Sequence, residues 1–198
     1  MEQEFKWRAR PEQFEALCDG LKLVPNAQAT IQMDATYYDT PDSLLRAHKI
    51  GLRLRRENVQ SVCCMKLRNT EQNGLHVHAE YECAADTLAQ GLRDLPAQGA
   101  PADLCAQLMQ VPLIPIAHVQ FVRQPVLWIQ DGFTAELSLD TGTLGSQTNQ
   151  TDFCEIECEY KSGDYTAFQS ACQTQAARLA LTPEPLSKLA RALSLSKV

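Results

Sequence analysis

The chain has 198 residues, of which 44% are hydrophobic and 21% are charged, and these proportions are ordinary for a globular protein. Its 18 basic and 24 acidic residues give a net charge of −6, which argues against a nucleic-acid partner. No apolar run approaches the roughly 18 residues that a membrane span needs, and the first residues are charged and polar rather than those of a signal peptide. We therefore expect a cytoplasmic protein without a membrane or nucleic-acid partner, folded as a single domain over residues 1–198.

The first half of the chain alternates apolar and polar residues with a period of two, which predicts strands. A strand over Gln3–Arg10 precedes a helix that begins at Pro11 and places Phe14, Leu17 and Leu21 on its apolar face. Further strands are expected at Thr30–Asp39, Gly51–Asn58, Val62–Asn69 and Leu75–Cys83. Asn73-Gly74 is a turn signal, and sequential hairpins of this kind form antiparallel sheets.

The second half begins with a proline-containing stretch, Leu95–Pro115, which we interpret as a connection between two halves rather than a domain boundary. Asp86 can cap a short helix that runs to Leu92, and a helical pattern covers Ala102–Gln110. The remaining elements expected are strands at Ala117–Gln130, Phe133–Asp140 and Asp152–Lys161, a turn at Asp131-Gly132, and helices from Asp164 to about Ala180 and from Ser187 to about Leu195. The pattern is α+β and dominated by antiparallel strands.

The eight cysteines do not form a Cys-x-x-Cys pair, and a chain of this length does not need a disulfide scaffold. Cys154 and Cys158 are four residues apart with no histidine nearby, so their spacing does not predict a zinc site. We expect reduced thiols that are mostly buried.

Charged residues occupy one side of the predicted strands, because successive side chains point to opposite faces. The basic positions are Lys6, Arg53, Arg55, Lys66 and Arg68, and the acidic ones are Glu2, Glu4, Glu80, Glu82, Glu136, Asp140, Glu155, Glu157 and Glu159. An open sheet with one face in water would also alternate. However, several strands carry only acids or only bases, whereas a solvated face normally mixes signs. If the sheet closes, this face becomes an interior and helices cover the apolar face, so the strands would form an antiparallel β-barrel with a charged lumen and helices packed outside.

Such a lumen has a definite chemical use. Carboxylates hold hard divalent cations such as Mg²⁺ or Mn²⁺ through oxygen. Guanidinium and ammonium groups hold the oxygens of a polyanion, and together with a metal they match a phosphate chain. The sequence contains no glycine-rich phosphate loop, so side chains would have to bind the phosphates.

An ordered set of motifs resembles the CYTH domain, the triphosphate tunnel metalloenzymes, over essentially the whole chain. The motifs are Glu2-Gln3-Glu4-Phe5-Lys6, Tyr37-Tyr38-Asp39-Thr40-Pro41, Gly51-Leu52-Arg53-Leu54-Arg55, Lys66, Arg123, Glu155-Ile156-Glu157 and Ser187-Lys188. The stretch Gly51–Tyr81 and Leu186-Ser187-Lys188 followed by Arg191 look most like the bacterial inorganic triphosphatase branch. Several members of the family carry a further C-terminal helical domain, which this sequence does not include. The family's fold is an eight-stranded antiparallel tunnel, in agreement with the strand pattern.

The resemblance also implies roles for individual residues. The triphosphate would be held by Lys6, Arg53, Arg55, Lys66, Arg123 and Lys188, and the metal, Mg²⁺ or Mn²⁺, by Glu2, Glu4, Glu80, Asp140, Glu155 and Glu157, with Glu82 as an alternative to Glu80. The residues expected to act in catalysis are Glu2, Glu4, Lys6, Arg53, Arg55 and Lys66. Glu159, Arg68 and Glu136 match the family pattern less securely.

One position departs from the family pattern, because His78 stands where the family often has arginine. His76 lies on the same face of the strand. Both can be polar lumen or rim residues without a chemical role. Alternatively, His78 contacts phosphate when protonated, which would make activity sensitive to pH near the imidazole pKa of about 6.5.

The function implied by the resemblance is metal-dependent hydrolysis of tripolyphosphate to pyrophosphate and phosphate. Alternatives are hydrolysis of thiamine triphosphate or a nucleoside triphosphate, removal of an RNA 5′-triphosphate, cyclisation of ATP, or non-catalytic binding of polyphosphate. The aromatic residues fall mostly on the apolar side of the strands, which favours a bare polyphosphate over a substrate with a base. The partner expected is thus a small-molecule polyphosphate, and a homodimer formed through an outer apolar strand face is possible.

Overall fold

A computed structural model describes residues 2–130, 132–146 and 149–195, without the side chains of residues 68–70. In this part of the chain the strands are β1 (Glu2–Arg8), β2 (Ile31–Asp39), β3 (Ile50–Glu57), β4 (Gln60–Gln72), β5 (Leu75–Ala84), β6 (Ile114–Gln130), β7 (Phe133–Gly145), β8 (Gln150–Gly163) and β9 (Thr182–Pro183). The helices are α1 (Pro11–Leu21), α2 (Leu44–Ala47), α3 (Leu88–Asp94), α4 (Ala102–Leu108), α5 (Tyr165–Arg178) and α6 (Lys188–Ser194), with 3₁₀ turns η1 (Ala27–Ala29) and η2 (Leu95–Gln98).

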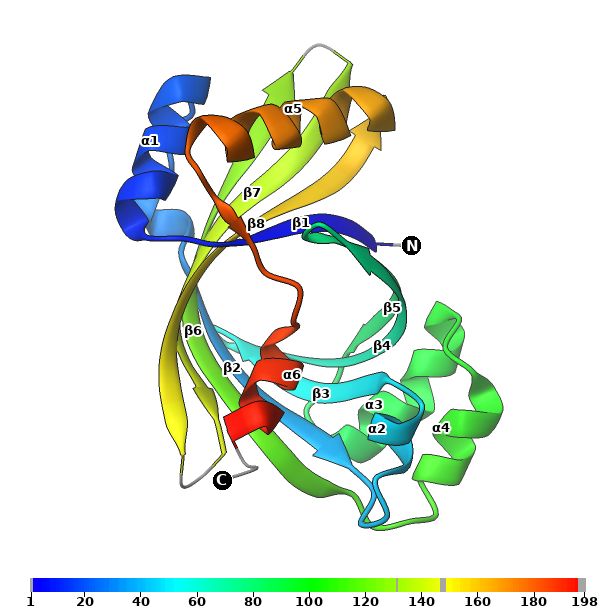
Figure 1. The fold of residues 1–198 in the computed structure, drawn as a ribbon. Helices are drawn as coiled ribbons and strands as arrows, with labels where there is room; N and C mark the ends of the chain where they lie inside the picture. Colours follow the sequence, from blue (N-terminus) through cyan, green and yellow to red (C-terminus); the bar gives the residue numbers. More distant parts are fainter. Residues whose placement is uncertain (1, 131, 147–148, 196–198) are drawn as a thin grey trace.

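The strands form one antiparallel sheet in the order β5-β4-β3-β2-β6-β7-β8-β1-β9. β1 also pairs with β5, with Glu2 opposite His78, so the first eight strands in this order close on themselves. Figure 1 shows the resulting ring around an open centre. Closure leaves no long unpaired edge among these eight strands and gives the sheet an inner and an outer face. The prediction of an eight-stranded antiparallel barrel is confirmed.

Two clusters of apolar side chains on the outer face hold most of the helices. α1 and α5 pack against Phe5, Trp7 and Ile156 of β1 and β8, while α3 and α4 pack against Leu52 and Met65 of β3 and β4. These side chains alternate along the strands with the charged positions, so each strand presents its apolar side to a helix. Helices therefore cover the outside of the barrel, as predicted (Figure 1).

The last helix, α6, packs against the inner face instead. Its buried Ala192 joins a cluster with Phe121 and Phe153, whose side chains lie on the same side of β6 and β8 as Arg123 and Glu155. Figure 1 shows α6 lying across the opening of the barrel. Apolar packing therefore fills part of the interior, whereas the sequence predicted charge along the whole inner face.

Several boundaries differ from the prediction for local reasons. β1 ends at Arg8 rather than at residue 10, because Arg10 caps α1 and Pro11 occupies its first turn. The side chain of Thr87, and not of Asp86, accepts the capping hydrogen bond of α3. The expected turn at Asn73-Gly74 is present, with a positive φ at both residues; Asp131 of the other turn lies outside the described residues. The very short α2 and β9 have no signal in the periodicity.

Candidate functional site

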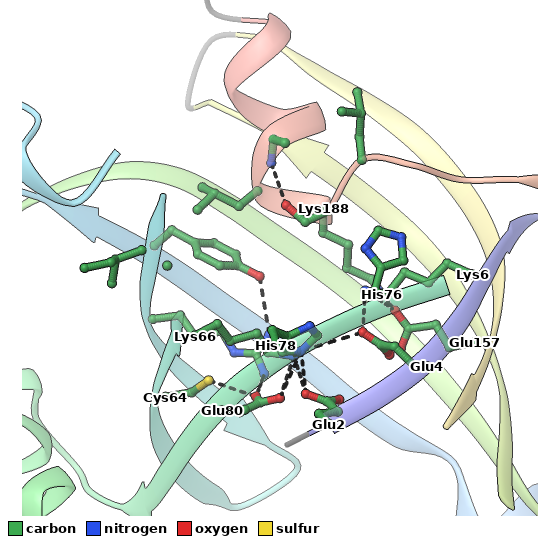
Figure 2. Close-up of a pocket in the computed structure, with 18 of the residues that line it drawn as sticks. Glu2, Glu4, Lys6, Cys64, Lys66, His76, His78, Glu80, Glu157 and Lys188 are labelled. Carbon is green, nitrogen blue, oxygen red and sulfur yellow. Dashed lines mark hydrogen bonds and ion pairs between the residues drawn. The ribbon is translucent and has the colours of Figure 1, made fainter. Parts of the chain in front are cut away.

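The interior of the barrel contains a cavity of about 760 Å³. Its walls come from β1 to β6, from β8 and from α6, and Figure 2 shows ten of the lining residues with labels. All the predicted site residues except Asp140 and Glu155 line it: Glu2, Glu4, Lys6, Arg53, Arg55, Lys66, Glu80, Arg123, Glu157 and Lys188. Asp140 and Glu155 are fully buried in the wall behind Lys188. The fold thus brings residues from the whole length of the chain to one cavity.

Lys6 occupies the wall formed by β1 and β8, whose register places it opposite Glu157. Its ammonium nitrogen lies 3.1 Å from a carboxylate oxygen of Glu157 and 3.0 Å from one of Glu4. Burial alone would lower the pKa of Lys6, but Glu157 and Glu4 raise it well above its usual value. Lys6 is therefore a permanent positive charge inside the tunnel.

Asp140, which is buried in the wall of the cavity, accepts hydrogen bonds from two of the predicted phosphate-binding residues. Arg123 lies opposite it on β6 and donates two hydrogen bonds, of 2.8 and 2.7 Å, to its two carboxylate oxygens. Lys188 of α6 donates a third, of 2.7 Å. With both oxygens occupied and no exposed surface, Asp140 orients these two cations towards the cavity.

The buried Glu155 and the half-buried Arg191 form a second pair beside Asp140. Arg191 and Lys188 both donate to Glu155, and burial raises the pKa of Glu155 despite the opposing effect of Lys188. The guanidinium group of Arg191 lies 5.1 Å from the centre of the Phe153 ring, which is cation–π geometry. Arg191 was part of the family resemblance without a predicted role, although its spacing of three residues from Lys188 places both on one side of a helix.

The two arginines of β3 face acids of β5 across the lumen wall. Arg53 lies 3.1 Å from Glu80 and 3.3 Å from Glu82, and Arg55 lies 3.3 Å from Glu82. Arg53 also donates to the hydroxyl of Tyr37 at 3.4 Å. Burial would raise the pKa of Tyr37, but Arg53 lowers it below its ordinary value. Tyr37 belongs to the Tyr37–Pro41 motif of the family resemblance. Because Tyr37 and Tyr38 are neighbours of the same type, the sequence did not indicate which of the two rings enters the tunnel.

At the seam between β1 and β5, Glu2, His78 and Glu80 converge on Lys66 (Figure 2). The ammonium nitrogen of Lys66 lies 3.1 Å from Glu2 and 2.6 Å from Glu80. Burial would raise the pKa of Glu2, but Lys66 and His78 together lower it far below its usual value. His76, by contrast, points to the chain that leads to α6, where its Nε2 lies 2.8 Å from the carbonyl oxygen of Glu184.

Three groups of donors among the described residues could hold a metal ion. They are Glu2 with His78 and Glu80, Cys64 with Glu80 and Glu82, and Asp140 with Glu155 and Glu157. Carboxylate oxygens are the donors that Mg²⁺ and Mn²⁺ prefer, so the acids of the tunnel fit a divalent cation. Glu4, which was also predicted as a ligand, belongs to none of these groups and pairs with Lys6.

Two of the three less secure candidates, Glu159 and Glu136, have described side chains, and Glu159 lines the cavity. Glu159 pairs with Lys161 at 2.7 Å, Glu136 is half-buried, and the side chain of Arg68 lies outside the described residues. The eight cysteines are free thiols, and burial raises the pKa of Cys18 to about 11 and of Cys63 to about 12. Such thiols are poor nucleophiles. None of the described helices is long and apolar enough to span a bilayer.

Comparison with known proteins agrees with this geometry. The sequence model of the CYTH domain family matches residues 1–193. An inorganic triphosphatase of Haemophilus influenzae is 32% identical over 137 residues, a match that covers 65% of this chain and 36% of that protein. The chain thus matches only about a third of the length of this relative.

Two solved structures share the fold over nearly their whole length. One is a protein from Hippeastrum described as having a dominant triphosphatase activity, with a TM-score of 0.67, 18% identity, and coverage of 100% of this chain and 97% of that one. The other is the PH1819 protein of Pyrococcus horikoshii OT3, with a TM-score of 0.64, 16% identity, and coverage of 98% and 99%. At these identities the likeness concerns the fold.

Proposed function

The chain belongs to the CYTH domain family, and from that premise we propose that it hydrolyses inorganic triphosphate to pyrophosphate and phosphate with a divalent cation, Mg²⁺ or Mn²⁺. The observation that carries the proposal is the cavity itself, in which every predicted phosphate-binding cation is paired with a carboxylate. The pairs join Lys6 to Glu4 and Glu157, Arg53 to Glu80, Arg55 to Glu82, Lys66 to Glu2, Arg123 to Asp140, and Lys188 to Glu155.

Binding of triphosphate would exchange these partners. Phosphate oxygens take hydrogen bonds from the arginine and lysine side chains, with arginine able to donate two at once. The carboxylates released from those pairs are then buried anions without a counter-charge, which is costly. Those carboxylates would be available to hold a divalent cation, whose charge would compensate theirs.

Each residue then has a role that follows from its position. A bound divalent cation neutralises charge on phosphate oxygens and acidifies water. Arg123 and Lys188, held in place by Asp140, stabilise the charge of the phosphoryl group during its transfer. Glu155 holds Lys188 and Arg191 from the buried side. Most of the rate enhancement in such a site is positioning and electrostatics.

The lining of the cavity favours a bare polyphosphate. Phe5, Trp7 and Trp128 lie in the outer core, so they offer no platform for a base. Phe121 and Tyr37 line the cavity, but the Phe121 ring lies 4.9 Å from the ammonium nitrogen of Lys188, and the Tyr37 hydroxyl accepts a hydrogen bond from Arg53. Thiamine triphosphate and nucleoside triphosphates remain the alternative substrates.

The experiment is phosphate release from tripolyphosphate, ATP, thiamine triphosphate and pyrophosphate, each with Mg²⁺, Mn²⁺ or EDTA. We expect metal-dependent turnover of tripolyphosphate in preference to ATP. Arg55→Ala should lower kcat/KM for tripolyphosphate by about 100-fold, because it removes one charged donor from the site. The matched control is Arg56→Ala, because Arg56 is exposed and lies 3.8 Å from Asp34. Binding of tripolyphosphate without turnover under every metal would overturn the proposal.

A further inference from the structure

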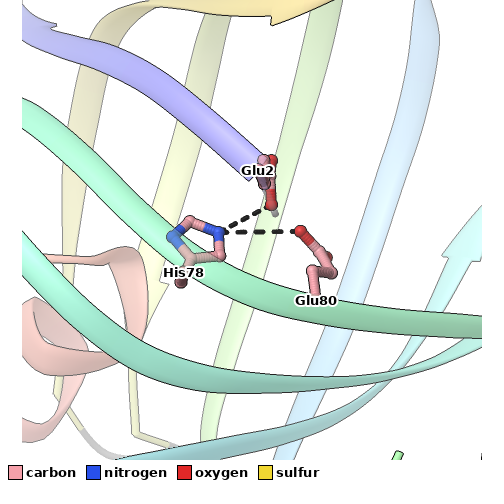
Figure 3. Close-up of side chains that lie close together, drawn as sticks. All are labelled: Glu2, His78 and Glu80. Atoms are coloured by element: carbon pink, nitrogen blue, oxygen red, sulfur yellow. Dashed lines mark hydrogen bonds and ion pairs between the residues drawn. The ribbon is translucent and has the colours of Figure 1, made fainter. Parts of the chain in front are cut away.

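Glu2, His78 and Glu80 place two carboxylate oxygens and one imidazole nitrogen around a common point (Figure 3). The register of β1 and β5 sets His78 opposite Glu2, and Glu80 follows two residues later on the same side of β5. The Nε2 atom of His78 lies 2.6 Å from Glu2 and 3.7 Å from Glu80. The side chains are between 11 and 16% exposed, and all three line the cavity, so an ion in the tunnel can reach them.

These separations suit a metal ion. Ligand atoms at about 2.1 Å from a common transition ion lie roughly 3 to 3.5 Å from one another. The observed distances of 2.6 and 3.7 Å lie on either side of that range. Small movements of side chains that face open space would therefore complete the geometry.

A positive charge already stands among the three donors. The Lys66 ammonium nitrogen lies 3.1 Å from Glu2, 2.6 Å from Glu80 and 3.1 Å from His78 Nε2. It therefore contacts all three potential ligands at once, as a bound cation would. A cationic group of the protein therefore already occupies the point of convergence.

The ammonium group does not satisfy all of these contacts. His78 Nε2 has either a proton or a lone pair. If Nε2 carries a proton, it can donate to Glu2 at 2.6 Å, but the proton then faces the Lys66 ammonium group at 3.1 Å. If Nε2 has a lone pair, it can accept from Lys66, but the lone pair then faces those of the Glu2 carboxylate. A metal ion in place of the ammonium would use the lone pairs of the imidazole and of both carboxylates, so no contact would be opposed.

We propose that Glu2, His78 and Glu80 form a site for a divalent transition ion such as Mn²⁺, Co²⁺ or Zn²⁺, and that the Lys66 ammonium occupies this site until the ion replaces it. The imidazole ligand decides the class of ion, because Mg²⁺ takes oxygen donors and seldom nitrogen. Cys64, whose thiol donates to Glu80 at 2.9 Å, adds a second soft atom next to the site.

The site gives Lys66 a way to couple substrate and metal. A triphosphate in the tunnel attracts the Lys66 ammonium and so vacates the point between the three donors. This coupling rests on the proposed function, whereas binding of the ion to the free protein does not. The two are therefore tested separately, and the test of the site uses metal alone.

The experiment titrates metal-free protein with Mn²⁺ and measures free Mn²⁺ by electron paramagnetic resonance, without any phosphate. Pulsed measurements on the bound ion should show modulation from a directly coordinated imidazole nitrogen, and a large excess of Mg²⁺ should not remove it. His78→Gln should abolish the nitrogen modulation and weaken this binding by about 10- to 100-fold. Lys66→Met should strengthen it by at least about tenfold, because the ion no longer has to displace an ammonium group.

His118→Gln is the matched control. His118 lies 2.7 Å from the carboxylate of Asp34 and does not line the cavity, so it offers the same pair of groups outside the tunnel. The proposal predicts unchanged binding in this variant. Nitrogen modulation that persists in His78→Gln would overturn the proposal, and so would equal or weaker binding in Lys66→Met. A gain of affinity cannot arise from misfolding, so Lys66→Met remains decisive if His78→Gln folds poorly.

Discussion

Asp140 is a fully buried anchor for two of the predicted site cations, Arg123 and Lys188. It has no exposed surface, and it accepts two hydrogen bonds from Arg123 and one from Lys188. A buried carboxylate between a buried and a half-buried cation is stabilising only as a complete set, because removal of one partner leaves an uncompensated charge. The structure thus favours a positioning role for Asp140, whereas its role as a metal ligand remains a prediction.

Asp140→Asn should therefore affect both folding and binding. We expect the free energy of unfolding to fall by about 3 to 5 kcal/mol, the usual cost of breaking a buried ion pair. Affinity for tripolyphosphate should fall as well, because Arg123 and Lys188 lose their common anchor. Urea unfolding and calorimetric titration measure the two effects. The exposed Asp152→Asn serves as the control, and an unchanged unfolding curve for Asp140→Asn would contradict the positioning role.

Among the elements, the segment that joins α5 to α6 determines how Lys188 reaches the cavity and how Arg191 reaches Glu155 in the wall. β9 pairs with the end of β1, and Glu184 follows it with 1% of its surface exposed. The Glu184 carboxylate accepts hydrogen bonds from Arg8 at 2.7 Å and from the Leu186 amide at 3.0 Å. Its backbone amide donates to the carbonyl of Lys6 at 2.9 Å. Glu184 therefore attaches the segment before α6 to the barrel wall.

The charge of Glu184 gives this attachment a pH dependence. Burial would raise the pKa of Glu184, but the hydrogen bonds from Arg8 and Leu186 lower it below its ordinary value of 4.5. A carboxyl group with a lowered pKa in the folded state stabilises the fold above about pH 4.5, and this contribution is lost as the pH falls further. Glu184→Gln should lower the free energy of unfolding by about 1 to 3 kcal/mol at pH 7.

Urea unfolding between pH 7 and pH 3 measures this effect. The difference between wild type and Glu184→Gln should shrink as the pH falls below about 4.5. Glu12→Gln is a suitable control, because Glu12 and its partner Arg10 are exposed and 3.9 Å apart. A difference that stays constant over this pH range would show that the Glu184 charge does not hold the segment.

At the scale of the whole molecule, the tunnel is close to electrically balanced before any ligand enters. The six predicted phosphate-binding cations are all paired with acids of the described residues. A phosphate chain that enters without a metal would therefore add negative charge to a balanced, partly buried site. Charge balance thus makes binding of triphosphate and of divalent cation mutually dependent, and by linkage each must raise the affinity for the other.

This dependence should be visible in thermal unfolding. Tripolyphosphate with Mg²⁺ or Mn²⁺, at about 100 times its dissociation constant, should add about 2.7 kcal/mol of stability. For a chain of this size that corresponds to an increase in Tm of roughly 5 to 10 °C. In EDTA at matched ionic strength the increase should nearly vanish, and metal alone provides the second control. An equal increase in Tm in EDTA would contradict the mutual dependence of triphosphate and cation binding.

The sequence by itself determined which side of each strand carries charge, because side chains alternate along an extended backbone whatever the strand's neighbours are. The sorting of Arg53 and Arg55 from Glu155 and Glu157 argued against a solvated open sheet, and the resemblance to the family supplied the eight-stranded tunnel and most of the site. The homodimer expected from the sequence stays a prediction.

Only the tertiary structure decided which of these charges meet. The contact of Glu2 with His78 joins residues 76 positions apart, and it exists because β1 closes the barrel against β5. The roles of Arg191 and Glu184 depend on where α6 enters the interior, and no local pattern records that path. Alternation is a property of a single strand, whereas register across a closing seam and the docking of a helix depend on the packing of the whole chain.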